Sequence, residues 1–175
     1  MEEGARIGHL TVVKGVRNLK MGKNASIGRL NWISAFPLEN KNHFQHIEDR
    51  QPDLILKEES AITHRHILDC TESITIGSYT TVAGYASQFI THSIDVAESR
   101  QGAKPITIGD YCFIGTNVVI LGGATLPSRS ILGAKSLLNK AFEEELMLYG
   151  GVAAKPLQKL TGEERYFHRE KGFVN

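Results

Sequence analysis

Aliphatic residues recur at every sixth position between residues 106 and 137, and the fifth place of each hexad holds a small residue. A helix brings apolar residues back every three to four positions and an isolated strand every two, so neither explains this period. One short strand and one tight corner per hexad, stacked as a solenoid, do explain it. The aliphatic residues are Ile108, Ile114, Ile120, Leu126 and Leu132, and the small ones are Cys112, Val118, Ala124, Ser130 and Ser136.

The same hexad extends toward the N-terminus with two polar interruptions, at residues 39–53 and 92–104, which are expected to be loops that leave the solenoid. It slips by two residues at 69–73, where a corner is expected, and it ends after Leu138. The upstream aliphatic places hold Met21, Ile27, Ile33, Leu56, Ile62, Leu68, Ile76 and Val82, and the small places include Ala25, Asn31, Thr80 and Ala86.

These hexads predict a single all-β domain over residues 1–175, built as a parallel β-helix. Three hexads make one triangular turn, with the aliphatic residue pointing inward from each face. The ends of such a prism expose unpaired strand edges that must be covered. The irregular N-terminus and residues 156–175, which are charged enough to include a short helical segment, are the expected caps.

Composition narrows the possible partners. The chain has 20 Lys and Arg against 19 Asp and Glu, so no overall field favours nucleic acid or an anionic membrane. No run of 18 apolar residues occurs and the N-terminus lacks a signal-peptide pattern, so a cytoplasmic location is expected. Cys70 and Cys112 show no metal-type spacing and are interpreted as small core residues.

Five segments together resemble the hexapeptide-repeat acyltransferases, in particular the galactoside and maltose O-acetyltransferase branch and its polysaccharide-modifying relatives. They are residues 90–95 (ITHSID), 104–110 (KPITIGD), 114–116 (IGT), 132–136 (LGAKS) and 150–156 (GGVAAKP). The resemblance implies a left-handed β-helix, an exception to the usual right-handed crossover. It also implies acetyl-CoA as acyl donor and a homotrimer with active sites between subunits.

His92 is the candidate catalytic residue, because in this branch the histidine before a loop and a Lys-Pro-Ile-x-Ile-Gly restart is the general base. A neutral imidazole can take the proton from an acceptor hydroxyl as it attacks the thioester. The other ring nitrogen needs an acceptor, for which Asp95, Glu98 or a backbone carbonyl are candidates. The alternative is that His92 is an ordinary solvent-facing loop residue.

The resemblance also assigns residues to the acyl donor. The backbone amide of Thr116 is the candidate donor to the thioester oxygen, although Gly115-Thr116 could equally be an ordinary corner. The expected coenzyme contacts are Ala134, Asn139 and Lys140, with Lys155 and a further possibility, Lys159, for the phosphates. Val152-Ala153 and Lys135 depart from the family pattern, and each lysine could instead be a solvated surface charge.

The acceptor is expected to be a hydroxyl of a sugar or polysaccharide precursor, contacted by Thr63 or His64, by Asp95 and by Arg100. N-acetylation of an amino sugar on a nucleotide carrier is the main alternative. A metal site of His64, His66 and His92, as in the γ-class carbonic anhydrases, is a weaker one, because that family pairs two histidines five residues apart. A non-catalytic β-helix subunit is a fourth interpretation.

Overall fold

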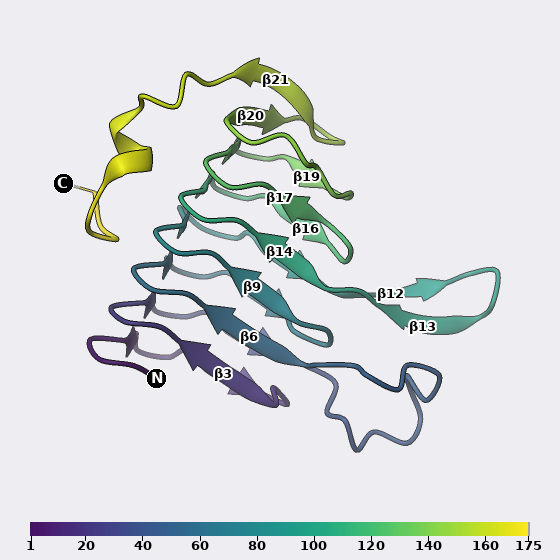
Figure 1. Ribbon diagram of the computed structural model, residues 1–175. Coiled ribbons are helices and arrows are strands. Elements are labelled where there is room, and N and C mark those ends of the chain that lie inside the picture. The colour runs from purple at the N-terminus through teal and green to yellow at the C-terminus, as the bar shows by residue number, and fades with distance from the viewer. Residues whose placement is uncertain (175) are drawn as a thin grey trace.

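Short parallel strands stack into three flat sheets that enclose a narrow core in the computed structural model, which describes residues 1–174 (Figure 1). The first sheet contains β1 (Arg6–Ile7), β4 (Ser26–Ile27), β7 (Ala61–Ile62), β10 (Thr81–Val82), β15 (Phe113–Ile114), β18 (Ile131–Leu132), β20 (Met147–Gly150) and β21 (Lys155–Lys159). The second contains β2 (Val12–Lys14), β5 (Trp32–Ser34), β8 (Ile67–Asp69), β11 (Gln88–Ile90), β16 (Val119–Leu121) and β19 (Leu137–Leu138). The third contains β3 (Asn18–Met21), β6 (Asp53–Leu56), β9 (Ile74–Ile76), β14 (Ile106–Ile108) and β17 (Thr125–Leu126).

The chain visits the three sheets in turn, so each coil lies on the one before it and the predicted left-handed parallel β-helix is confirmed. The aliphatic place of each hexad points inward and pairs with its counterpart in the next coil, as Val82 does with Ile114 and Ile114 with Leu132. Every predicted aliphatic position is at most 2% exposed. The period of six therefore encodes one continuous hydrophobic column per face.

The tight corners between strands explain why the fifth place of each hexad holds a small residue. At many of them a non-glycine residue adopts a left-handed conformation just before the small place, such as Asn117 with φ 56° before Val118. The prediction for Ala86 was wrong. Val82 and the next inward residue, Phe89, are seven positions apart, and the extra corner residue puts Ala86 at the exposed left-handed place while Ser87 fills the buried one.

The two interruptions differ from simple loops in detail. Residues 35–52 form the first excursion, because Asp53 already begins β6. The second is an antiparallel hairpin of β12 (His92–Asp95) and β13 (Arg100–Ala103) that projects from the prism. Cys70 and Cys112 are fully buried and unpaired, and burial raises the pKa of both thiols, which agrees with their assignment to the core.

The C-terminal segment covers a flank as well as an end. Strand β21 folds back antiparallel on β20 and closes the last coil, and the 3₁₀ helix η1 (Arg165–His168) then lies against the first sheet (Figure 1). Tyr166 donates its hydroxyl to the carbonyl of Cys112 at 2.9 Å, and Phe167 is 3% exposed. No helix among residues 1–174 is long and apolar enough to cross a membrane.

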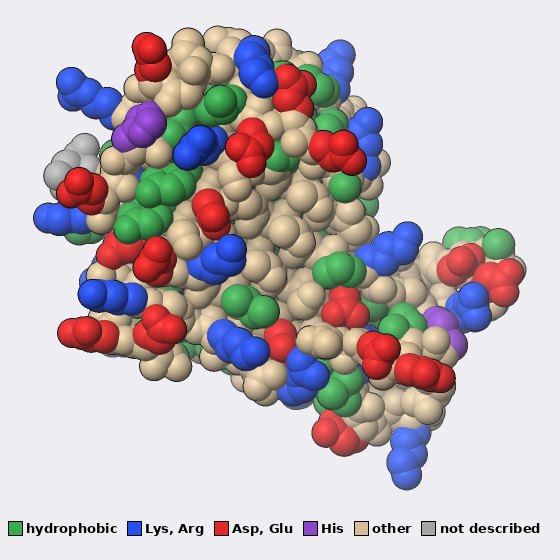
Figure 2. Space-filling view, in the orientation of Figure 1, with side chains coloured by type: hydrophobic (Ala, Val, Ile, Leu, Met, Phe, Trp, Pro, Cys, Tyr) green, Lys and Arg blue, Asp and Glu red, His purple; other side chains and the backbone are tan. Residues whose placement is uncertain are grey.

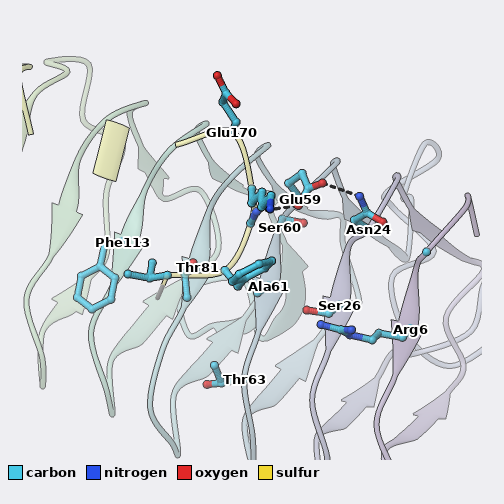
Figure 3. A pocket seen from close by; sticks show the side chains of 15 residues that line it. Arg6, Asn24, Ser26, Glu59, Ser60, Ala61, Thr63, Thr81, Phe113 and Glu170 are labelled. Atoms are coloured by element: carbon cyan, nitrogen blue, oxygen red, sulfur yellow. Dashed lines mark hydrogen bonds between the residues drawn. The ribbon is translucent and has the colours of Figure 1, made fainter. Parts of the chain in front are cut away.

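A cavity of about 750 Å³ lies between the end of this segment and the first sheet (Figure 3). Its floor is made by one side chain from each of five neighbouring strands, and Asn24 donates to Glu59 at its rim at 2.6 Å. The floor residues are Arg6, Ser26, Ala61, Thr81 and Phe113. This cavity is on a different face from the histidine singled out above.

Each hexad contributes one inward residue to the core, so truncating a single one of them should lower the stability of the fold. Replacing Ile120, which is fully buried, with Ala is expected to lower the free energy of unfolding by about 2–5 kcal/mol through lost burial and an unfilled cavity. Urea denaturation followed by circular dichroism measures this. Ile94→Ala on the hairpin, where the side chain is 64% exposed, is the matched control and should change the value by less than about 0.5 kcal/mol. Equal effects of the two substitutions would contradict the hexad assignment.

Candidate active site

Both excursions leave the prism at the edge between the second and third sheets. Residues 35–52 connect β5 to β6, and the β12–β13 hairpin lies between β11 and β14 two coils further on. The corner of the intervening coil, residues 70–73, lies between them. They project on the same side of the molecule in Figure 1, and in Figure 2 they form a lobe that extends from the body of the molecule on that side. The two interruptions of the hexad repeat are thus neighbours.

Asp69 holds His92 in place where the second excursion leaves the prism. The imidazole Nδ1 is 2.6 Å from Asp69 Oδ2, and the same oxygen accepts the backbone N–H of His92 at 3.1 Å. Asp69 ends β8 and pairs with Ile90 of β11, so it lies one coil below the point where His92 follows the strand. The side chains are 30% and 12% exposed respectively. This is a histidine–carboxylate pair with a partly open imidazole.

The carboxylate is itself fixed by several donors. Thr71 donates its hydroxyl to Oδ1 at 2.6 Å, and Thr91 donates its backbone N–H to Oδ2 at 3.0 Å. Burial opposes ionisation of Asp69, but the hydrogen bonds from His92 and Thr71 outweigh it and lower the pKa of the carboxyl group. In turn, the hydrogen bond to Asp69 raises the pKa of His92, against the effect of burial. An ionised Asp69 places the proton of a neutral imidazole on Nδ1 and leaves Nε2 as the basic nitrogen.

The predicted orienting groups, Asp95 and Glu98, are therefore wrong. Antiparallel pairing places His92 opposite Ala103 and Asp95 opposite Arg100, which takes Asp95 three residues out along the hairpin. Its Oδ1 accepts the N–H groups of Ala97 and Glu98, at 3.0 and 3.1 Å, and shapes the hairpin turn. Sequence reasoning missed Asp69, whose one available signal was its place at the two-residue slip of the repeat.

Aromatic rings from the first excursion pack around His92. The ring centroids of Phe36 and Phe44 lie 5.4 and 6.2 Å from that of His92, both edge-on. Arg50 is 4% exposed and holds this segment down by donating to the carbonyls of Phe36 and Thr71, each at 2.7 Å. These hydrogen bonds connect the first excursion to the corner that follows Asp69.

A cavity of about 610 Å³ opens beside His92. Four of the predicted site residues line it, namely His92, Asp95, Arg100 and Asn139, together with His46 of the first excursion. The imidazole Nε2 has no hydrogen-bond partner among residues 1–174. The cavity thus lies next to an imidazole with a fixed tautomer.

The remaining predicted residues do not meet His92 within one chain. Thr63, His64, Thr116 and Ala134 occupy corners between the first and second sheets, on another edge of the prism. Thr63 donates its hydroxyl to the carbonyl of Gly84 at 2.8 Å, and Nδ1 of His64 accepts the N–H of Arg29 at 3.0 Å. The Thr116 hydroxyl donates to the carbonyl of Tyr85, while its N–H has no partner among residues 1–174.

The lysines expected to contact the coenzyme are exposed. Lys140 follows Asn139 at the His92 edge, and its amine lies 5.0 Å from the centroid of the Phe142 ring. Lys155 begins β21 and pairs with Gly150. Lys159, at the other end of β21, forms an ion pair of 2.7 Å with Glu144. Neither Lys140 nor Lys155 forms an ion pair within residues 1–174.

The structure argues against the three-histidine metal site. His66 is fully buried at the small place of its hexad. Its Nδ1 accepts the N–H of Ser87 at 3.1 Å and its Nε2 lies 3.0 Å from the hydroxyl of Thr63, so both nitrogens are engaged. Burial lowers the pKa of His66 to about 4, consistent with a neutral structural histidine. No group of three potential ligands that could hold a metal ion is found over residues 1–174.

Comparison with known proteins agrees with the fold and the motifs. No protein-family model matches the chain. Galactoside O-acetyltransferase of Escherichia coli (strain K12) is 26% identical over 100 residues, which cover 55% of this chain and 49% of that enzyme. The match thus spans about half the length of this relative.

Solved structures extend the likeness to most of the chain. A hexapeptide-repeat acetyltransferase from Vibrio cholerae, complexed with acetyl coenzyme A, is 26% identical with a TM-score of 0.54, and the match covers 91% of this chain and 72% of that one. An N-acyltransferase from Bacillus cereus, in complex with dTDP-4-amino-4,6-dideoxyglucose and coenzyme A, has a TM-score of 0.67 over 91% of this chain and 84% of that one. At 12% identity this second likeness concerns the fold alone. The predicted resemblance to hexapeptide-repeat acetyltransferases is confirmed.

The Asp69–His92 pair predicts a specific titration behaviour. Asp69→Asn removes the carboxylate that stabilises the imidazolium, so the pKa of His92 should fall relative to the unsubstituted protein. The chemical shift of the imidazole Hε1 proton, followed by NMR across the pH range, measures it. Asp95→Asn is the control and should leave the pKa of His92 in place. A His92 titration that responds to Asp95 and ignores Asp69 would overturn the assignment.

Proposed function

We propose that this protein is an acetyl-CoA-dependent O-acetyltransferase that acts on a hydroxyl of a sugar or polysaccharide precursor, with His92 as general base. The observation that carries the proposal is the Asp69–His92 pair, whose Nε2 is unpartnered beside a cavity. The similarity to a galactoside O-acetyltransferase and to an acetyltransferase complexed with acetyl coenzyme A supports the donor and the reaction class.

The chemistry follows from the fixed tautomer of the base. Nε2 of His92 removes the proton of the acceptor hydroxyl as its oxygen attacks the thioester carbonyl. The new carbon–oxygen bond forms, the carbon–sulfur bond breaks, and the proton on His92 passes to the departing thiolate. Asp69 stabilises the transient imidazolium throughout, as an orienting carboxylate does in other histidine-dependent enzymes. No covalent acyl-enzyme is needed.

A homotrimer with shared sites would unite the two separated groups of candidate residues. The second sheet lies between the His92 edge and the Thr116 edge, and its outer face carries Trp32 and Ile67, which are 51% and 44% exposed. Exposed apolar surface of this kind is typical of protein interfaces. Three copies packed around an axis parallel to the solenoid would bring the His92 edge of one copy to the Thr116 edge of the next.

In that arrangement the donor would lie in the groove between two copies. The unpartnered N–H of Thr116 would stabilise the developing negative charge on the thioester oxygen. Asn139 and Lys140 would contact the pantetheine arm from the His92 edge, and Ala134 would do so from the other. Lys155 would meet the phosphates as a point charge.

N-acylation of a nucleotide-linked amino sugar is the second candidate, favoured by the fold likeness to the Bacillus cereus N-acyltransferase. The same base would deprotonate an ammonium group on the acceptor. A non-catalytic subunit would have no use for the partly open imidazole held by Asp69, so the catalytic interpretations are preferred.

The role of His92 can be tested directly. His92→Ala should lower the rate of acetyl transfer at least about a hundredfold, because the base is lost while the donor groove remains. Acetyl-CoA should still raise the melting temperature of the variant through linkage. His168→Ala, in the exposed C-terminal segment, is the matched control with unchanged rate. Near-normal turnover by His92→Ala would show that another group is the base.

Sharing of the site between copies predicts complementation. Thr116 precedes Asn117, whose φ is 56°, so proline at 116 should fit the corner while removing the N–H in question. Thr116→Pro and His92→Ala should each be weakly active alone. Unfolding and refolding the two together should restore part of the activity, because mixed trimers contain sites with an intact His92 from one copy and an intact Thr116 amide from another. If mixing restores nothing while mixed trimers form, the shared site is refuted.

A further inference from the structure

We infer that the acceptor carries an anionic group, a carboxylate or a phosphate, that is bound by Arg100 and Lys104 beside His92. This inference rests on the proposed transferase function and specifies its substrate class. Both cations line the cavity that contains His92. Neither side chain forms an ion pair or a hydrogen bond with any of residues 1–174.

The hairpin fixes where these two charges lie relative to the base. His92 pairs with Ala103, and the N–H of the next residue, Lys104, donates to the carbonyl of Thr91 at 2.9 Å. Lys104 thus directly follows Ala103, the residue that pairs with His92. Its aliphatic stem passes over Gly123, where an added Cβ would lie 3.3 Å from Lys104 Cδ. Arg100 begins β13, four residues or roughly 13 Å from Lys104 along the chain.

The charge of the cavity wall is one-sided. Asp95 is the one acidic residue that lines it, and Oδ1 of this carboxylate already accepts two backbone N–H groups. Asp69 is not among the residues that line the cavity, and its carboxylate oxygens already accept hydrogen bonds from His92, Thr71 and Thr91. Asp95 is opposite Arg100 in the ladder, yet neither Arg100 nor Lys104 forms an ion pair within residues 1–174. An arginine and a lysine without ion-pair partners on one cavity wall favour a ligand that brings its own negative charge.

The cavity also offers an unsatisfied acceptor. Gln101 lines it between the two cations in sequence, and its Oε1 is buried without a hydrogen-bond partner in the described part of the chain. Leaving such an atom unpaired is costly, so a rotation of the Gln101 side chain that lets Oε1 accept from a ligand hydroxyl would gain affinity. Two cations and one free carbonyl oxygen suit a molecule with an anionic group and several hydroxyls, such as a uronic acid or a sugar phosphate.

The phosphates of acetyl-CoA are a poorer match for these cations. In that molecule the phosphates lie at the far end of the extended pantetheine arm from the thioester. When the thioester carbonyl is next to Nε2 of His92, the phosphates of acetyl-CoA are therefore well removed from Lys104, which directly follows the residue paired with that histidine. Lys140 and Lys155, outside this cavity, remain the candidates for the coenzyme.

The test compares sugars that differ in charge alone. Isothermal titration of the full-length protein with glucose, glucuronate and glucose 1-phosphate, and with the matching galactose series, measures affinity independently of turnover. We expect an acidic member of one series to bind at least about tenfold more tightly than its neutral parent. Whether glucuronate-type or phosphate-type ligands gain more distinguishes the two sources of charge.

Substitutions assign the preference to the two residues. The double variant Arg100→Gln/Lys104→Gln should lose the tenfold preference and, in acetyl transfer assays, raise the KM for the acidic sugar while changing the KM for acetyl-CoA by less than about twofold. Lys20→Gln/Lys23→Gln, on exposed positions of another edge, is the charge-matched control. The inference is overturned if no acidic sugar outbinds its neutral parent, if the preference survives the double variant, or if the KM for acetyl-CoA rises instead. Failure of acetyl-CoA to bind at all would refute the proposed transferase, while the anion preference would still be measurable.

Discussion

The stacking of one coil directly on the next is the constraint on which the rest of this structure depends. Parallel hydrogen bonding fixes each strand in register with its neighbours about 4.8 Å away, so every place in the hexad becomes a column along the prism. An inserted residue within a strand would move inward side chains outward. Extra chain can therefore be accommodated at corners, and both large excursions leave from one edge. The register thus determines where a site can be built.

The Asp69–His92 pair is a direct product of that register. Asp69 is opposite Ile90, and the chain turns out of the sheet two residues later at His92, so the carboxylate one coil below meets the imidazole. The two residues are 23 positions apart in sequence. That offset depends on an extra corner residue near Ala86 and on the course of the corner after Asp69, neither of which follows from a strict hexad. For this reason the sequence pattern predicted the buried core but did not indicate Asp69 as the partner of His92.

Asp95 was predicted to orient His92 because the two residues are close in sequence, and this prediction was wrong for a related reason. Residues 92–104 have no hexad, so nothing in the pattern distinguishes a compact loop from a projecting hairpin. The hairpin ladder moves Asp95 outward and brings Ala103 and Lys104 back to His92. The hexad predicted which residues are buried, and the family motifs predicted His92 and the residues of the Thr116 edge. Contacts between the two excursions, such as Phe36 against His92, depend on chain paths that carry no periodic signal.

Two different structural elements therefore position His92 and form the cavity beside it. The strands and tight corners hold Asp69 and His92, whose geometry follows from a rigid, buried register. Phe36, Phe44 and Arg50 on one excursion, and Arg100 and Gln101 on the other, form the walls around them. Arg50 connects the first excursion to the Asp69–His92 pair. Its guanidinium donates to the carbonyl of Thr71, and the Thr71 hydroxyl donates to Asp69. Corner insertions can change the walls without disturbing the column beneath them, so one scaffold can keep the Asp69–His92 pair while the cavity beside it varies.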